Sequence, residues 1–178
     1  MTNYCTQNSL LLNNLMKFYN VDSNLDKILP IINGESEISL RLIDWFVTNY
    51  AKKNFTVYMK GKDRFKVYID YKLKLKAYSK KRFDPFCRWD RINIPYKDNN
   101  YIQTTIGQLN FFRWALENEI ISYIKKNTKN IINDMNKRNS TSKKRELKKN
   151  ERKRREELSV CASKSIKKET VEIIVKFD

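Results

Sequence analysis

The sequence predicts an α+β fold in which a long β-hairpin, or ribbon, packs against two main helices and is followed by a basic flexible segment and a C-terminal strand. Apolar residues recur at helical spacing over 38–53 and again over 105–137. Between these stretches, from Phe65 to Ala77, apolar and polar residues alternate strictly, which is the period of a β-strand. This change of period within 178 residues predicts one mixed domain with a tail.

The N-terminal part is predicted to be helical. Leucines and aromatic residues at helical spacing predict one or two short helices over 8–32, and we expect the second to end at Pro30 because proline interrupts a helix. The stretch 38–53 is apolar on most of its sides, which is typical of a buried helix. We interpret it as the central core helix, capped by Ser36 or Ser39.

The first strand of the ribbon is short. It holds Phe55, Val57 and Met59 and ends at a turn around 60–63. Pairing Met59 with Arg64 would set apolar residues against charged ones, so we expect a different register. The expected pairs are Met59 with Phe65, Val57 with Val67, and Phe55 with Ile69.

The second strand of the ribbon is longer than the first, so Tyr71–Ala77 needs a further neighbour. The alternating run Val171–Phe177 near the C-terminus is the best candidate for that neighbour. Residues 83–103 are expected to be irregular, with a turn at Asp84–Pro85.

A long helix is predicted over 105–137. Thr105 and Gln108 have the spacing of a capping box, and a break is expected near Asn127. Beyond the helix, like charges at helical spacing oppose a stable helix. The chain therefore divides into an α+β domain (1–137), a basic segment that is flexible or marginally helical (138–165), and a C-terminal strand that returns to the sheet (166–178).

The net charge of +17 lies entirely in two segments. Residues 52–82 hold twelve Lys or Arg against two acids, residues 137–157 hold eleven against four, and the remainder balances at fourteen against fourteen. The composition fits an AT-rich genome, which raises the lysine content but does not confine it to two places. A positive field of this kind is typical of nucleic-acid binding, so we expect DNA or RNA as the partner, with a merely solvated basic surface as the alternative.

One candidate binding surface is the polar face of the predicted strand. Lysines that alternate with tyrosines on an exposed sheet would combine phosphate attraction with stacking surfaces for bases. The predicted phosphate contacts are Lys66, Lys72, Lys74 and Lys76, and the predicted stacking partners are Tyr68 and Tyr78. An ordinary solvated face is the alternative.

The second candidate is a basic arm that reads phosphates and not bases, so its binding would be independent of sequence. Its residues are Lys143, Lys144, Arg145, Lys148, Lys149, Arg152, Lys153, Arg154 and Arg155. A nuclear-import signal and a solvated charge run remain alternatives for the same stretch.

The sequence predicts no catalytic residue, metal site or cofactor. It has no histidine, its three cysteines (Cys5, Cys87 and Cys161) are far apart, and it lacks a glycine-rich phosphate loop. The D-x-K pattern Asp70-Tyr71-Lys72 loosely resembles the PD-(D/E)xK nucleases, with Asp63, Glu37 or Asp44 as further acids. The motif's proline is absent, however, and Asp63 would lie in the hairpin turn far from Asp70.

The remaining expectations concern partners and location. The N-terminus is not a convincing signal peptide, and no apolar run approaches the roughly 20 residues of a membrane span, so we expect an intracellular protein without a membrane partner. The competing function is that of a structural or assembly protein whose basic patch meets an acidic protein partner. The oligomeric state stays open.

Three phrases carry a resemblance to a known family. They begin at Leu42 (LIDWFVTNY), Tyr78 (YSKKRFDPFCR) and Gly107 (GQLNFFRWA). With them, the block from about Ile38 to Met135 resembles a conserved, functionally uncharacterised protein of large nucleocytoplasmic DNA viruses. The resemblance implies a setting in a cytoplasmic virus factory or a virion, and it transfers no catalytic residue.

Overall fold

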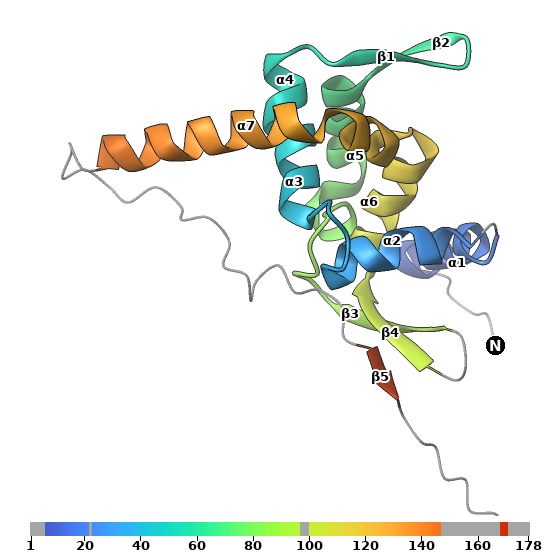
Figure 1. Ribbon diagram of the computed structural model, residues 1–178. Helices are drawn as coiled ribbons and strands as arrows, with labels where there is room; N and C mark the ends of the chain where they lie inside the picture. Colours follow the sequence, from blue (N-terminus) through green and yellow to red (C-terminus); the bar gives the residue numbers. More distant parts are fainter. Residues whose placement is uncertain (1–5, 22, 97–99, 147–167, 171–178) are drawn as a thin grey trace, which may run out of the picture.

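The computed structural model describes residues 6–21, 23–96, 100–146 and 168–170. The elements along the chain are α1 (Gln7–Tyr19), α2 (Asn24–Asn33), α3 (Leu40–Trp45), the π-helical turn η1 (Phe46–Tyr50), α4 (Ala51–Lys53), β1 (Val57–Lys60), β2 (Asp63–Lys66), α5 (Val67–Arg82), β3 (Arg91–Pro95), β4 (Asn100–Thr105), α6 (Ile106–Glu117), α7 (Ile120–Glu146) and β5 (Lys168–Thr170). The helices form the body, with the β1–β2 hairpin at one end and the β3–β4–β5 sheet at the other (Figure 1). The α+β class is therefore confirmed.

The two N-terminal helices are α1 and α2, as predicted. The Thr6 side chain caps α1 by accepting a hydrogen bond from the Ser9 amide. The expected stop at Pro30 is wrong, because α2 includes this proline and continues to Asn33, after which Gly34 caps the helix with φ 77°. Ile31 and Ile32 beyond it are each 3% exposed, and their burial outweighs the lost backbone hydrogen bond.

The central core helix is α3, η1 and α4 in one continuous run. Ser39 accepts a hydrogen bond from the Leu42 amide at its start, and Phe46 is fully buried. In an α-helix, Trp45 and Lys53 would lie about 80° apart around the axis, but the wide turn of η1 takes up one extra residue. Both side chains therefore reach Asp134 of α7, at 3.1 Å from Trp45 Nε1 and 3.3 Å from Lys53 Nζ.

The β1–β2 hairpin exists, but its expected register is wrong. The pairs are Val57 with Lys66, Tyr58 with Phe65, Met59 with Arg64, and Lys60 with Asp63. A two-residue turn sets this register, since Gly61 adopts the φ of 61° that tight hairpin turns require. The apolar pair that faces the body is consequently Tyr58 with Phe65.

The long second strand is also wrong, because the chain becomes helix α5 directly after β2. The stretch Lys72–Ala77 consists of lysine, leucine and alanine, which are strong helix formers. In the helix, Val67 and Tyr71 lie one turn apart and face the core, at 0% and 8% exposure. Their burial and the local propensity favour the helix over the alternating strand.

The stretch expected to be irregular contains a second antiparallel pair, β3 and β4. Ile94 and Ile102 face each other in this pair and are both buried. The C-terminal strand β5 adds to the edge of β4, with Ile102 opposite Lys168, and not to Tyr71–Ala77, which is helical. The predicted run Val171–Phe177 lies outside the described residues.

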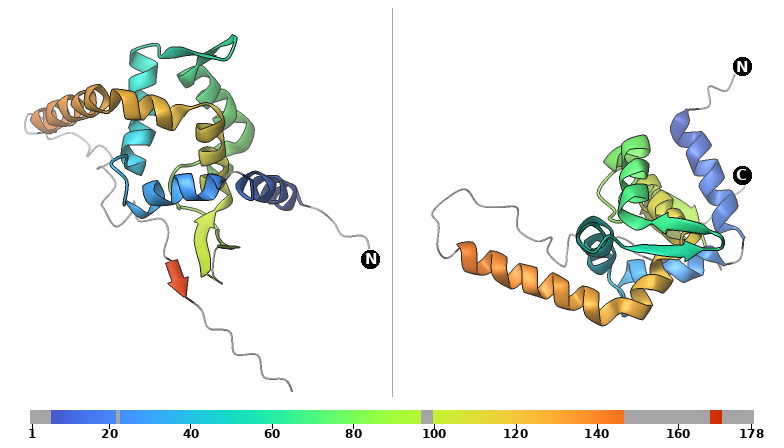
Figure 2. Two further views of the ribbon diagram at one scale, coloured as in Figure 1. Left: turned by 45° about the vertical axis from the view of Figure 1, so that its right-hand side comes forward. Right: turned by 90° about the horizontal axis from the view of Figure 1, so that it is seen from above.

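The long C-terminal helix is confirmed but is broken elsewhere. Thr105 caps α6 by accepting from the Gln108 amide, as the capping-box spacing predicted. The break falls at Asn118–Glu119, where Glu119 has φ 56°, and not near Asn127. Helix α7 then crosses the body and projects beyond it (Figures 1 and 2).

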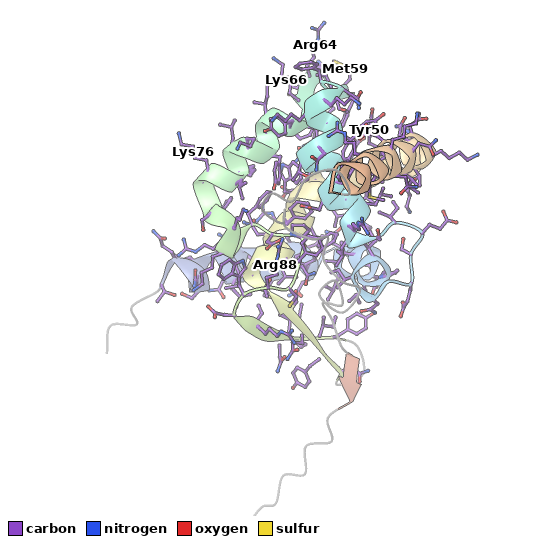
Figure 3. The ribbon with its side chains drawn as sticks, turned by 90° about the vertical axis from the view of Figure 1, so that its left-hand side faces the viewer. Tyr50, Met59, Arg64, Lys66, Lys76 and Arg88 are labelled. Atoms are coloured by element: carbon purple, nitrogen blue, oxygen red, sulfur yellow. The ribbon has the colours of Figure 1, made fainter. Side chains whose placement is uncertain are left out.

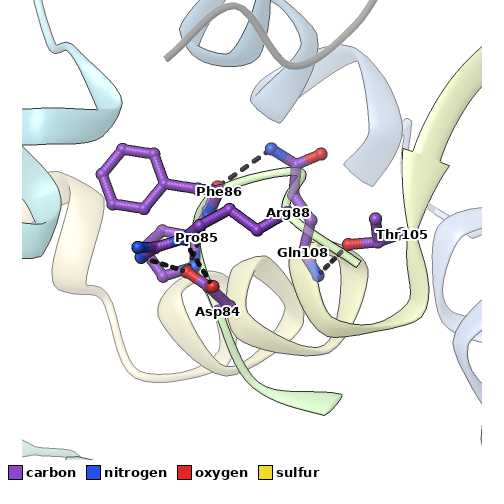
Figure 4. A network of polar contacts seen from close by, with 6 residues as sticks. All are labelled: Asp84, Pro85, Phe86, Arg88, Thr105 and Gln108. Atoms are coloured by element: carbon purple, nitrogen blue, oxygen red, sulfur yellow. Dashed lines mark hydrogen bonds and ion pairs between the residues drawn. The ribbon is translucent and has the colours of Figure 1, made fainter. Parts of the chain in front are cut away.

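A network of polar contacts, built around the buried side chains of Asp84 and Gln108, joins the segment after α5 to α6 (Figure 4). Arg88 binds the Asp84 carboxylate with two hydrogen bonds, of 2.9 and 3.1 Å. The Gln108 side chain donates to the Pro85 carbonyl at 2.9 Å. Gly107 allows this approach, because a Cβ there would lie 2.9 Å from the Lys81 carbonyl oxygen. Two of the phrases that carry the family resemblance thus meet in one packing contact.

Candidate functional site

The hairpin and α5 together present a surface on which exposed basic and apolar side chains alternate. We call it the outer face, and its residues are Lys52, Phe55, Val57, Met59, Arg64, Lys66, Ile69, Lys72, Leu73 and Lys76. Arg64, Lys66 and Lys76 point away from the body along this side (Figure 3). The two acids of this segment face elsewhere: Asp63 alternates with Arg64 onto the other side of β2, and Asp70 accepts a hydrogen bond from Trp114.

The opposite side of the hairpin fixes the outer face in place. Tyr58 stacks on Tyr123 of α7 with 5.1 Å between ring centroids and donates its hydroxyl hydrogen to the Asn118 carbonyl. Burial raises the pKa of Tyr58, so the phenol stays protonated and remains a donor. Lys60 adds a 2.9 Å hydrogen bond to the Asn118 side chain. These contacts hold the hairpin against the break between α6 and α7.

Helix α5 is held from its inner side. The Trp114 indole donates to the Asp70 carboxylate at 2.6 Å, and the Tyr71 ring packs against Phe83 and Trp114. Since these contacts all lie on one side of α5, the side that carries Lys72 and Lys76 is left to solvent. The helix therefore presents its basic side as a fixed surface.

The outer face contains two adjacent surface pockets. One of about 430 Å³ is lined by Ala51, Lys52, Phe55, Thr56, Val57, Lys66, Tyr68 and Ile69. The other, of about 450 Å³, is lined by Tyr68, Ile69, Lys72, Leu73, Leu75 and Lys76. Because Tyr68 and Ile69 line both, the pockets form one groove, which we call the α5 groove.

The predicted strand-face residues do not form a single row. Lys66, Lys72 and Lys76 are exposed on the outer face, and the described part of the chain gives none of them an ion-pair partner. Lys74 is half-buried and lies about 160° around the helix from Lys72, on the other side.

The two tyrosines predicted to stack on bases are also half-buried. Lys52 Nζ lies over the Tyr68 ring at 5.7 Å from its centroid. Tyr78 stacks on Phe83 with 6.3 Å between centroids. Each ring therefore already has a partner within the protein.

The structure describes only the beginning of the predicted basic arm. Lys143, Lys144 and Arg145 lie in the last turns of α7, which extends to Glu146. The other predicted arm residues lie outside the described residues: Lys148, Lys149, Arg152, Lys153, Arg154 and Arg155. Within the segment expected to be flexible or marginally helical, residues 138–146 belong to α7.

The D-x-K pattern lies on a helix and not on a strand. Asp70 is bound to Trp114, and the whole of β2 (Asp63–Lys66) and the first turn of α5 lie between it and Asp63. Among the described residues, no group of three His, Cys, Asp or Glu side chains could hold a metal ion. The thiol of Cys87 is partly buried, which raises its pKa above the usual range.

One partly buried carboxylate, that of Asp44, stands out among the titratable groups. Burial, together with the nearby Asp84 charge, raises the pKa of Asp44 to about 6, while the Arg88 and Lys80 charges oppose the shift. Asp44 belongs to α3, which is not part of the outer face. Its titration affects stability and not the groove.

Sequence reasoning missed Phe55, Ile69 and Leu73 as surface residues. Phe55 is 85% exposed, Leu73 60% and Ile69 54%. A usable signal exists for the helix positions: Ile69 with Leu73 and Lys72 with Lys76 are each four residues apart, so a helix places both pairs on one face. No comparable signal exposes Phe55.

Comparison with known proteins gives the family. A model described as a family of unknown function, DUF7197, matches residues 2–177. The chain belongs to this family. The DUF7197 chain is also similar to "Uncharacterized protein L507" of Acanthamoeba polyphaga mimivirus, with 48% identity over 144 residues.

That alignment covers 75% of this chain and 55% of the mimivirus protein, so the chain spans about half the length of this relative. The predicted resemblance to an uncharacterised protein of large DNA viruses is confirmed. No solved structure matches the DUF7197 chain. In the part of the chain that the structure describes, no helix is both long and apolar enough to cross a membrane.

Proposed function

We propose that this DUF7197 protein binds DNA or RNA without catalysing a reaction on it, through phosphate contacts that are largely independent of sequence. The observation that carries the proposal is the outer face, where Lys66, Lys72 and Lys76 are exposed and no acid shares their side of the hairpin and α5. Unpaired cations on a rigid surface attract a polyanion by releasing its counterions.

The basic end of α7 is the second element of the proposal. Lys143, Lys144 and Arg145 would add phosphate contacts at a distance from the outer face, because α7 projects beyond the body (Figure 2). Base stacking is not part of the proposal, since Tyr68 and Tyr78 have partners within the protein. The viral relative favours a virus factory or a virion as the place of action.

The test is fluorescence anisotropy of labelled single-stranded DNA, single-stranded RNA and duplex DNA over a salt series. The test variant neutralises Lys66, Lys72 and Lys76 to glutamine. A matched control neutralises three exposed lysines of α7 to glutamine, Lys125, Lys126 and Lys129, so both variants lose the same charge. A third variant neutralises Lys143, Lys144 and Arg145.

We expect the test variant to lower the slope of log affinity against log salt by about 0.7–0.9 for each phosphate that it no longer binds. The control should retain most of the affinity. An equal loss in the test and control variants would contradict a located binding face. Absence of binding by the full chain at low salt would overturn the proposal altogether.

A further inference from the structure

The outer face exposes more apolar surface than phosphate binding requires. Phe55, Val57, Ile69 and Leu73 are 85%, 47%, 54% and 60% exposed, and the α5 groove joins them. Soluble proteins seldom expose neighbouring large apolar side chains unless a partner covers them. The aliphatic residues among them offer a nucleic acid neither a charge nor an aromatic face.

The backbone holds Phe55 in an unusual position. Phe55 has φ 45°, a left-handed conformation that is costly for a bulky residue. Its neighbours are fixed, because the Asn54 amide donates to the Tyr50 carbonyl and the Thr56 amide to the Ala51 carbonyl. These bonds end α4 with a left-handed residue, a common way for a helix to terminate, and they fix the Phe55 ring in solvent at the border of the α5 groove.

The size of the α5 groove suits the side chains of a bound segment. Its two parts, of about 430 and 450 Å³, meet at Tyr68 and Ile69. Each falls within the roughly 300–1,000 Å³ typical of pockets that enclose a ligand. Ile69 and Leu73 lie one turn apart, or about 6 Å along the axis of α5. Two apolar anchors of one segment could occupy the two parts together.

The charge around the groove identifies the occupant. Lys52 and Lys66 border one part, and Lys72 and Lys76 border the other. A second copy of this chain would bring its own basic groove to the contact, so like charges oppose self-association. An amphipathic segment with acidic residues beside its apolar anchors complements both features.

We propose that the α5 groove binds an acidic amphipathic segment of a partner protein. Apolar anchors of the segment contact Phe55, Ile69 and Leu73, and its carboxylates pair with the bordering lysines. This proposal does not rest on nucleic-acid binding, because it requires apolar residues that phosphates do not use. The shared lysines would make the segment and a nucleic acid compete for the outer face.

The probe is a displayed library of random peptides, selected against the full chain. Enriched peptides are synthesised with a fluorescent label and their affinities measured by anisotropy. The groove variant is Ile69→Gln with Leu73→Gln, since glutamine suits a helix and both positions are exposed. The control is Leu10→Gln on α1, an equally apolar position with 53% exposure. Circular dichroism checks that each variant is folded.

We expect enriched peptides to carry acids together with apolar residues at helical spacing. The groove variant should weaken them by about tenfold or more, and the Leu10 control should not. Failure to enrich such peptides, or equal binding to the groove variant, would overturn the proposal.

The same variants separate the other occupants. A loss of nucleic-acid affinity in the groove variant comparable to its loss of peptide affinity would assign the groove to nucleic acid instead. A dimer in sedimentation experiments that the groove variant abolishes would assign it to a second copy. Neither result bears on the lysine variants, so this proposal and the nucleic-acid proposal can fail separately.

Discussion

Val67 and Ile69 provide a direct test of the helical state of α5. In a strand the two side chains would share a face and contribute similarly to the free energy of unfolding. In the helix, by contrast, Val67 is 0% exposed and Ile69 is 54% exposed. Val67→Ala removes two buried carbon atoms, worth about 0.8 kcal/mol each, and leaves a small cavity. We expect it to lower the free energy of unfolding by about 2 kcal/mol.

Ile69→Ala should behave differently, because half of the side chain is already in water and alanine is the better helix former. We expect its free energy of unfolding to stay within about 0.5 kcal/mol of the parent. Urea unfolding followed by circular dichroism measures the free energy of unfolding of both variants. The slope of this free energy against urea concentration should equal that of the parent, which confirms that the same folded and unfolded states are compared. Similar losses of about 2 kcal/mol in both would refute the helical assignment.

Two further perturbations test positions away from the outer face. The pKa of Asp44 is raised to about 6, so its neutral form is favoured in the fold and stability from this group falls as the pH rises from about 4 through 6. Asp44→Asn should therefore raise the free energy of unfolding by about 2–3 kcal/mol at pH 8 and hardly at pH 4; equal gains at both pH values would contradict the raised pKa. Gly107→Ala places a Cβ 2.9 Å from the Lys81 carbonyl oxygen, and we expect a loss of about 1–3 kcal/mol in the same urea assay, where an unchanged midpoint would contradict the tight contact.

The elements that the sequence predicted correctly are those whose local signal and burial agree. The capping pair Thr105 and Gln108 marks the start of α6, and the apolar stretch 38–53 becomes the buried α3–η1–α4 run. In both cases the hydrophobic period and the capping residues support one conformation.

The errors arise where two local signals conflict. Alternation from Phe65 to Ala77 is a strand period, but its lysines, leucines and alanine are helix formers, and burial of Val67 and Tyr71 one turn apart decides for the helix. In the hairpin, the register that matches apolar faces differs from the register that a two-residue turn imposes. The turn at Gly61 decides the register. The position of Phe55 depends on the left-handed turn by which the chain leaves α4, and no glycine marks that turn in the sequence.

The sequence predicted the charge of the outer face correctly but not the full set of residues that lies on it, because the strand period was assumed for α5. Charge is a property of the segment and survives the change from strand to helix, so the basic character of 52–82 was predictable. The side that each lysine occupies depends on the period, which changes from 2 to 3.6 residues. This is why Lys74 lies off the outer face while Ile69 and Leu73 lie on it.

The wide turn η1 lets the run from α3 to α4 hold one residue more than an α-helix would, without turning the residues that follow around the axis. Loss of one residue within Phe46–Tyr50 would convert this stretch into an ordinary α-helix and leave α4 and the hairpin at nearly the same angle to α3. A further inserted residue that no wide turn takes up would instead rotate α4 and the hairpin by about 100°. The direction of the outer face is therefore tolerant of a one-residue deletion in η1 and sensitive to an insertion there, although the buried residues of α3 are the same in both cases.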